Sequence, residues 1–466
     1  MKRKYFSNSI LMSGTLVFTK IVEFVLIAIL TRIVSTQGYG EYSLFNSWVN
    51  ILSIVIGGSI GSSFGIAKKD FKEHYSRYLA SCVGLSYLFL AIAFVIGFVI
   101  NESWDVYYLG LIILHSFNSN TLSNYDVMLI FDEKFVKASL INILKSVFSF
   151  AAILSGVLIL RNLDGGMVAI VMLFISYMVL SVFAQINMFV TTRCFYNKEY
   201  WIYAFKNSYL MIFHNLSLVV LNQMDRIMIG NILDNSYVAI YSIIYSLSVV
   251  MSILWTGVHR VWLPWLYDSF EKEKVGRISR INNYLLLTMA FLTINYCYIS
   301  PEFTKLFFRA EYWDGIDMMP SILFGYFFSF LFSVFVNIEY CNKRIKWITP
   351  GTIMSAGINI VTNYLFIPIW GYKAASYTTL LSYFSLFAYH YLINRKYKYF
   401  ENKVLCSIVG AMCLLLEMCA IFSDNWVVRY SVLLFFDIFS MYVINRIMKK
   451  NNIDYRCILD SFLHKQ

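Results

Sequence analysis

Charged residues are scarce in this chain of 466 residues. Only 14% are Asp, Glu, Lys or Arg, whereas 59% are hydrophobic, and the mean hydropathy is +0.62. Soluble domains carry about a quarter charged residues, so this composition excludes an ordinary soluble protein. The net charge of +11 then belongs to loops at a membrane surface, and it does not indicate a nucleic-acid partner.

The chain also lacks the patterns of most enzymes and metalloproteins. Its eight Cys residues show no paired spacing, so no disulfide framework or zinc site can be read from them. It contains no Gly-rich phosphate loop, no H-E-x-x-H motif and no nucleophile elbow. No loop is long enough to fold as a catalytic domain. We therefore expect a protein that is not an enzyme, since a glycan polymerase or ligase would need a large outward loop.

Apolar stretches are what the sequence has in abundance. Each of fourteen stretches is about long enough to cross a hydrocarbon core of roughly 30 Å as a helix. They run over 10–30, 44–66, 78–100, 106–131, 138–160, 167–190, 208–232, 237–258, 283–300, 317–340, 348–368, 374–394, 405–422 and 427–445. The predicted fold class is an all-α polytopic membrane protein with about 14 transmembrane helices.

The positive charges alternate with these stretches. Most of the 38 Lys and Arg residues fall on one side of the membrane once the stretches are marked. They gather in residues 2–4, 68–72, 260–280, 343–346, 395–403 and from 446 onward. Cytoplasmic loops carry such an excess, so both termini are predicted to be cytoplasmic.

The chain shows a weak internal similarity. The first stretch is followed by Arg32 and Gly40-Glu-Tyr-Ser43, and the seventh by Arg226 and Ala239-Ile-Tyr-Ser242. Two tandem units of six helices in one orientation predict two lobes around a central cavity. The expected domains are a first six-helix lobe over 1–200, a second over 201–400, and an extra helix pair with a cytoplasmic tail over 401–466.

Several ionisable side chains lie inside the stretches, where a charge costs roughly 2.5–3.5 kcal/mol and normally faces a cavity or another charge. Lys20 and Glu23 share one helix face. They form either a structural ion pair or a cavity-facing cation tempered by an acid. Lys145 has no local acid and is expected to face the cavity. Asp126 is expected either to pair with Lys145 or to cap a polar network.

Two stretches carry an oxygen-rich set. Asn359 and Asn363 share one face of the eleventh stretch, Thr378 and Thr379 follow in the twelfth, and Asp225 is a separate acid in the seventh. A carboxylate, two amides and a hydroxyl suit a hard cation such as Na⁺, and the acid alone suits proton coupling. The alternative is ordinary hydrogen bonding between helices, worth ~1 kcal/mol per contact.

Two neighbours of this set are open to interpretation. Adjacent positions on a helix point about 100° apart, so Arg226 and Asp225 cannot serve one partner on the same face. Arg226 is expected to snorkel to the outer interface. His214 is either a hydrogen-bonded packing residue or a member of a proton relay.

Three segments resemble the polysaccharide repeat-unit flippases, the O-antigen and capsule exporters of bacterial envelopes. This family belongs to the multidrug/oligosaccharidyl-lipid/polysaccharide exporter superfamily. The segments are 13–42 with Lys20 and Arg32, 222–226 with 239–242, and 359–379 with Pro368 and Gly371. The resemblance covers the whole chain in topology and these three stretches in sequence.

The resemblance implies two six-helix lobes in a V around a central cavity. It implies alternating-access transport of undecaprenyl-diphosphate-linked oligosaccharide repeat units from the cytoplasmic to the outer leaflet, for O-antigen, capsular or exopolysaccharide assembly. The implied location is the bacterial inner (plasma) membrane. The implied partners are the lipid-linked oligosaccharide, membrane lipid, and the polymerase and chain-length regulator of the same pathway.

The resemblance also assigns roles to residues. The related lipid II flippases carry a basic residue at the Lys20 position and another for which Arg260 is the nearest match. We expect Lys20 and Arg260, with Arg32 and Lys145, to bind the diphosphate. A sodium site of that branch matches Asp225, Asn359, Asn363 and Thr379 by order and spacing. An acid would be expected in place of Asn363, so coupling to H⁺ or weak coupling to Na⁺ is expected.

Two rival functions remain open from the sequence. A cation-coupled drug or metabolite antiporter of the same superfamily would favour an acidic, aromatic cavity over a cationic one. A lipid II-type flippase would use a similar cationic cavity for a different lipid-linked substrate.

Overall fold

The computed structural model describes residues 2–100, 105–189, 194–272, 275–397, 399–400, 402–421 and 425–450. Over these residues the secondary structure is helical, which confirms the predicted all-α class. The first seven helices are α1 (Lys2–Ile33), α2 (Thr36–Gly57), α3 (Phe64–Phe71), α4 (Tyr75–Ile100), α5 (Val106–Phe131), α6 (Phe135–Ile159) and α7 (Gly165–Phe189). The next seven are α8 (Lys198–Ile232), α9 (Asn235–Ser248), α10 (Val250–Glu271), α11 (Val275–Phe307), α12 (Met319–Cys341), α13 (Ile348–Trp370) and α14 (Ala374–Asn394). The last pair is α15 (Asn402–Ile421) and α16 (Trp426–Lys450).

Short 3₁₀ segments connect several of these helices. They are η1 (Ile60–Ser63), η2 (Lys72–His74), η3 (Ala310–Met318), η4 (Ile345–Trp347) and η5 (Arg395–Tyr397). By length and composition, 7 stretches of the described residues are apolar enough to cross a membrane. The polar α5, with His115, Asn118, Asn120 and Asn124, is not one of them.

Two of the stretches expected to be continuous are each divided into two helices. The stretch 44–66 breaks after α2, where Gly58 and Ser59 have φ values of 54° and 49°. Glycine adopts this left-handed conformation without steric penalty, and a methyl group on Gly58 would lie 2.5 Å from the Phe89 ring. The stretch 237–258 breaks at Val249, between α9 and α10. The second span of each sequence half is therefore the one that breaks.

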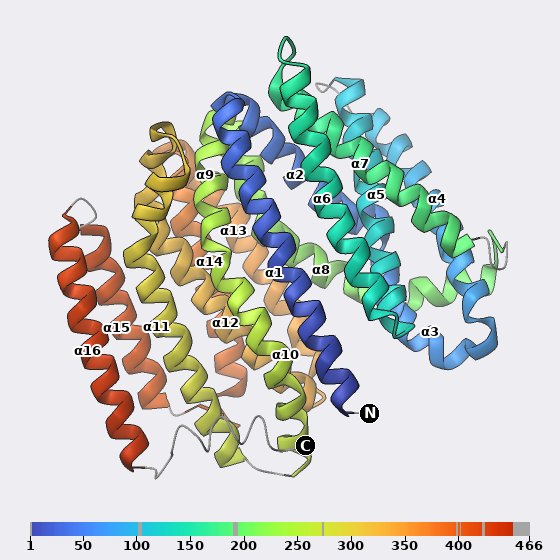
Figure 1. Ribbon diagram of the computed structural model, residues 1–466. Helices are drawn as coiled ribbons and strands as arrows, with labels where there is room; N and C mark the ends of the chain where they lie inside the picture. The colour runs from blue at the N-terminus through green and yellow to red at the C-terminus, as the bar shows by residue number, and fades with distance from the viewer. Residues whose placement is uncertain are drawn as a thin grey trace.

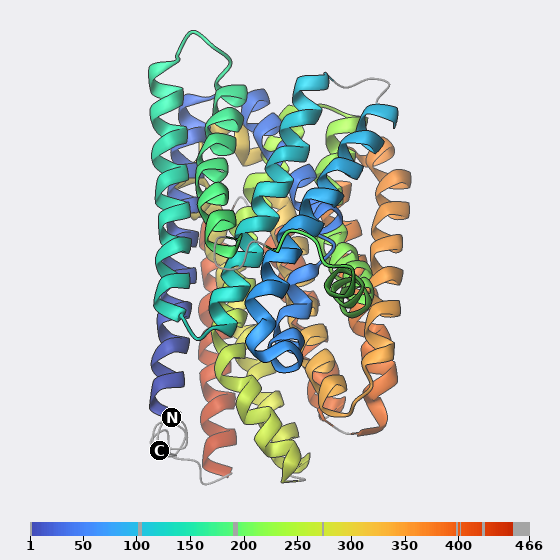
Figure 2. The same ribbon diagram turned by 90° about the vertical axis from the view of Figure 1, so that its right-hand side faces the viewer.

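The helices form two groups that α8 connects (Figure 1). We call α1–α7 the first lobe and α9–α14 the second lobe. The beginning of α8 lies across the other helices and is viewed nearly end-on in Figure 2. It packs against α4, while its later turns pack against α13. The pair α15 and α16 lies on the outside of α11.

The two lobes pack most closely at one end of the bundle. We call the end that holds the N-terminus and the α12–α13 connection the basic end, and the other the opposite end (Figure 1). At the opposite end α2 packs closely on α9, and a methyl group on Gly40 would lie 1.8 Å from the backbone oxygen of Asn235. Thr36 donates to Glu311 at 2.6 Å across the same interface. Backbone contact therefore closes this end.

Candidate functional site

Asp225 is the most enclosed acid of α8 and accepts four hydrogen bonds. Its Oδ1 accepts from Asn359 Nδ2 at 3.0 Å and from Asn363 Nδ2 at 2.6 Å. Its Oδ2 accepts from the hydroxyls of Tyr241 and Thr379, each at 2.6 Å. All five side chains are buried. The carboxylate thus joins α8, α9, α13 and α14 at a single point.

The local sequence explains why the amides reach one carboxylate. Asn359 and Asn363 are one helical turn apart and present their side chains on the same face of α13. Asn363 Nδ2 also lies 3.2 Å from Asn359 Oδ1. Thr378, at the start of α14, donates to Asn363 Oδ1. The structure therefore brings together the four residues that the sequence grouped, and their role in ion coupling stays a prediction.

The amide groups of Asn359 and Asn363 can rotate to present oxygen atoms to a cation beside Asp225. Rotating the two amides would direct their oxygens at the carboxylate, since an amide carries an acceptor and two donors on one rigid plane. Asp225 is the one acid among these four side chains, so the set suits a monovalent cation or a proton better than a divalent ion. Among the described residues, no three His, Cys, Asp or Glu side chains gather as a metal site.

Arg226 is buried beside this set, so the expectation that it snorkels to the outer interface is wrong. Its exposed fraction is 7%, and its Nε donates to Ser242 at 3.0 Å. Its guanidinium carbon lies 4.4 Å from the centre of the Tyr245 ring. Its Nη1 donates to the backbone oxygen of Asn222 at 2.9 Å. Hydrogen bonds and a cation–π contact hold the guanidinium inside the protein.

Two of the four predicted diphosphate-binding residues come together in the first lobe. Lys20 Nζ lies 2.6 Å from Glu23 Oε2, and these side chains are 39% and 55% exposed. Lys145 lies on α6, which packs along α1, and the charges of Lys20, Glu23 and Asp126 all act on it. Asp126 itself accepts a hydrogen bond from Asn142 at 2.7 Å. The two lysines are thus positioned as neighbouring cations.

The other two predicted residues lie elsewhere. Arg260 on α10 donates through Nη1 to Ser13 Oγ at 3.0 Å, which links the second lobe to the beginning of α1. Arg32 lies at the opposite end, where its Nη2 contacts the backbone oxygens of Leu306 and Phe307 at 3.4 and 3.3 Å. In this structure Arg32 joins the lobes together and is separate from the lysine pair.

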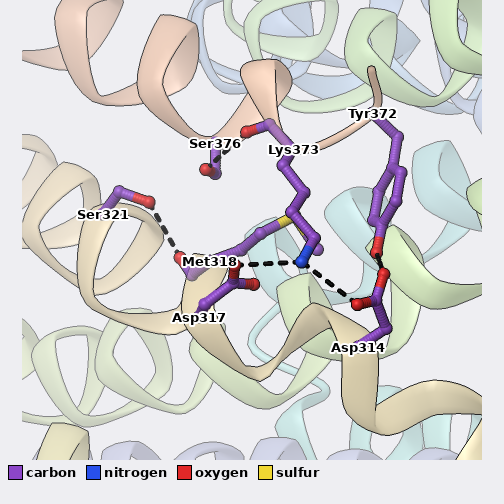
Figure 3. Close-up of polar contacts among 7 residues, drawn as sticks. All are labelled: Asp314, Asp317, Met318, Ser321, Tyr372, Lys373 and Ser376. Carbon is purple, nitrogen blue, oxygen red and sulfur yellow. Dashed lines mark hydrogen bonds and ion pairs between the residues drawn. The ribbon is translucent and has the colours of Figure 1, made fainter. Parts of the chain in front are cut away.

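A cluster of charges at the opposite end of the second lobe was missed from sequence. Lys373 lies between Asp314 and Asp317 at 3.2 and 3.0 Å, and Tyr372 donates to Asp314 (Figure 3). Burial lowers the pKa of Lys373, but the two carboxylates outweigh it and raise the pKa above its ordinary value. The cluster fastens η3 to the turn between α13 and α14.

A family model described as "Polysaccharide biosynthesis protein" matches residues 6–270. The chain belongs to this family. The match covers more than half of the chain, including α1, the lysine pair, Asp225 and the break in the second span. A membrane protein of Haemophilus influenzae described as uncharacterized is similar to this polysaccharide biosynthesis protein. It is 24% identical over 350 residues, which cover 72% of this chain and 81% of that one.

Solved structures establish the fold of this family member. A lipid II flippase, MurJ, in an inward closed conformation superposes with a TM-score of 0.72 at 14% identity, covering 94% of this chain and 99% of that one. An inward-facing multidrug resistance MATE family transporter of the MOP superfamily gives a TM-score of 0.61 at 12% identity, covering 84% and 95%. The polysaccharide biosynthesis protein therefore has the fold that these transporters share.

Sequence reasoning missed Tyr241 as a partner of Asp225. A signal was present, because Tyr241 belongs to Ala239-Ile-Tyr-Ser242, the sequence step that resembles Gly40-Glu-Tyr-Ser43. Ser242, the next residue of that step, is the partner of Arg226. This step thus supplies the hydroxyl groups that hold Asp225 and Arg226 of α8.

Proposed function

We propose that the protein is a flippase that moves undecaprenyl-diphosphate-linked oligosaccharide repeat units from the cytoplasmic to the outer leaflet. Its family and its fold support this proposal, and the neighbouring cations Lys20 and Lys145 midway along α1 and α6 carry it. A diphosphate crossing hydrocarbon needs positive charge along its route. The proposed location is the bacterial plasma membrane, with the basic end in the cytoplasm.

Lys20 is the proposed first contact for the diphosphate. Its present partner, Glu23, is more than half exposed, so an incoming phosphate oxygen can displace it. Charge-assisted hydrogen bonds from ammonium groups to phosphate are among the strong ones. Lys145 would add a second cation, and Arg260 a third from the second lobe at the basic end. Arg32 would act after the opposite end has opened.

The Asp225 set is the proposed coupling site. It joins four helices of the moving parts, so binding Na⁺ or H⁺ there would favour one arrangement of α8 and α9 over another. Arg226, the next residue, is a buried cation, so an added Na⁺ at Asp225 would leave a net positive charge in a buried place. This favours weak Na⁺ binding or proton binding over tight Na⁺ binding.

The repeat-unit assignment is tested by export in a strain that lacks its own copy of this protein. Surface glycan and lipid-linked repeat units on the cytoplasmic face are measured with wild type, Lys20→Ala and a control, Lys134→Ala. Lys134 is an exposed residue that pairs with Asp132 at 3.0 Å outside the proposed site. Wild type and the control should restore surface glycan, while Lys20→Ala should leave lipid-linked units trapped inside.

Other results would redirect the proposal. Full export with Lys20→Ala would remove the diphosphate role of that residue. Normal glycan with altered sensitivity to small cationic compounds would identify a drug or metabolite antiporter, and accumulation of lipid II would identify a lipid II-type flippase. The polymerase and chain-length regulator of the same pathway are the proposed partners.

A further inference from the structure

A second acid lies buried in the second lobe, away from Asp225. Glu339 is in the last turn of α12 near the basic end, and its side chain is 0% exposed. His390 and Asn394, on the facing α14, are 0% and 1% exposed. The two helices pack along each other over their length. These three polar side chains have no part in the diphosphate or coupling sites proposed above.

Their hydrogen bonds satisfy only one oxygen of the acid. Glu339 Oε1 lies 2.8 Å from His390 Nδ1 and accepts from Asn394 Nδ2 at 2.6 Å. Glu339 Oε2, His390 Nε2 and Asn394 Oδ1 have no hydrogen-bond partner among the described residues. Buried polar atoms are normally paired, so three open positions in one cluster indicate a site that receives something.

The net charge of Glu339 and His390 indicates which ligand this cluster binds. An ionised Glu339 beside a neutral His390 would leave one uncompensated negative charge in a fully buried place, which costs several kcal/mol. One added proton, on the imidazole or on the carboxyl, removes the net charge. The space is lined by one acid and one imidazole, and this donor set is too small to hold a divalent metal.

Titratable groups from α12 and α14 surround the pair. Tyr389 lies edge-on to the His390 ring, with centroids 5.1 Å apart. Tyr340 and Tyr389 both lie within electrostatic reach of Glu339. Phe332 covers the other side of the imidazole at 5.0 Å. These neutral rings exclude water and supply no positive charge.

The remaining neighbours are held by other partners. From α10, His259 Nε2 lies 3.0 Å from the amide nitrogen of Asn337, one half-turn before Glu339. The guanidinium of Arg344 lies 4.6 Å from the centre of the Tyr397 ring. His390 is therefore the basic side chain that is hydrogen-bonded to Glu339.

The unpaired nitrogen of the imidazole faces α13, which packs against α8. A methyl group on Gly351 of α13 would lie 2.8 Å from His390 Nε2. The next residue, Thr352, has its hydroxyl 3.3 Å from Nδ1 of His214 on α8, and the charge of His390 acts on His214. Asn215 then donates to Ser59 Oγ at 3.3 Å, at the break in the second span. Consecutive residues of α8 thus contact the second and the first lobe.

We propose that Glu339 and His390 form a proton-binding site, and that its charge acts on His214 of α8. One proton enters or leaves the pair, and no other bond changes. Protonation would alter the contact between His214 and Thr352. The position of α8 relative to α13 would then change. The site is separate from the Asp225 set and does not depend on the identity of the transported substrate.

The proposal is tested on the full chain in lipid nanodiscs with ¹⁵N-labelled histidine. The chain has only 6 His residues, and His390→Gln identifies the signal of His390. We expect this signal to pass between two protonation states from about pH 5 to about pH 9. In Glu339→Gln this response to pH should be lost or altered.

Controls separate protonation at this pair from general effects. Exposed His74 is an internal reference, and Glu199→Gln removes an exposed acid from the first turn of α8. Gly351→Ala should alter the His390 transition without removing either titratable group, which keeps the test valid if Glu339→Gln does not fold. A His390 signal that stays in one form over this range would overturn the proposal. A signal whose response to pH is the same in wild type, Glu339→Gln and Gly351→Ala would also overturn it.

Discussion

Arg32 of the first lobe lies against the last turn of α11 in the second lobe, with its Nη2 3.3 Å from the backbone oxygen of Phe307. The last carbonyl groups of a helix lack partners within the helix, and a cation there also interacts favourably with the helix dipole. One arginine thus stabilises contact between the lobes by completing the end of a helix. Transport that requires the lobes to separate at this end must break this interaction.

Replacing Arg32 by Gln should favour the arrangement with the opposite end open. The expected change is about fivefold in the population of separated lobes, equivalent to ~1 kcal/mol for a hydrogen bond. Spin labels at exposed Leu163 and Leu233 would report longer distances in a background without the native Cys residues. Arg161→Gln is the control, because Arg161 is exposed and its Nε donates to the backbone oxygen of Leu158 at the end of α6. Equal distances in the two variants would show that Arg32 does not hold the lobes.

A methyl group at Gly40 should prevent the lobes from meeting. The methyl would lie 1.8 Å from the backbone oxygen of Asn235, so the two helices must move apart. Gly40→Ala is expected to fold, to lengthen the same label distance, and to reduce transport. Gly257→Ala is the matched control, since a methyl there meets nothing within 4 Å. Normal transport by Gly40→Ala would show that this contact is not required in the cycle.

Replacing Asp225 by Asn should weaken the coupling set. The variant keeps the size of the side chain but replaces one acceptor with a donor that faces Tyr241 and Thr379. We expect a loss of about 1–3 kcal/mol in the free energy of unfolding, measured by thermal unfolding. Asn363→Asp should strengthen cation binding, because it adds a second carboxylate to the set. Na⁺ should then raise the unfolding temperature more than K⁺ does, and an equal response to both ions would argue against a sodium site.

The Lys373 cluster should stabilise the protein in a pH-dependent way. Because the pKa of Lys373 is raised in the folded protein, its contribution is complete below the ordinary Lys pKa of 10.5. The contribution is lost as the pH rises through the higher folded value. Lys373→Gln should lower the free energy of unfolding by ~0.5–1 kcal/mol near neutral pH, and by less in strongly alkaline solution. A difference that is constant up to about pH 12 would contradict this assignment.

The sequence predicted the helices and one long-range grouping. Apolar length alone located the spans, and spacing along α13 placed Asn359 and Asn363 on one face. The meeting of these residues with Asp225, 134 residues away, followed from resemblance to a family rather than from physical reasoning about the chain.

What could not be predicted depended on partners distant in sequence. Arg226 was expected at the interface because its buried partner, Ser242, is 16 residues away on another helix. Glu339 lies at the end of a span, where an acid is unremarkable, and its partner His390 is 51 residues further on. The breaks at Gly58 and Val249 depend on backbone angles, which apolar length does not report.

The contact of Gly40 with Asn235 also bears on leakage. Where backbone meets backbone so closely, no water molecule fits between the two helices at this point. A membrane potential of 100 mV stores about 2.3 kcal/mol per elementary charge, and a wide passage for lipid-linked sugar would dissipate it. A residue without a side chain at position 40 thus removes the room that water and ions would need at this contact between the lobes.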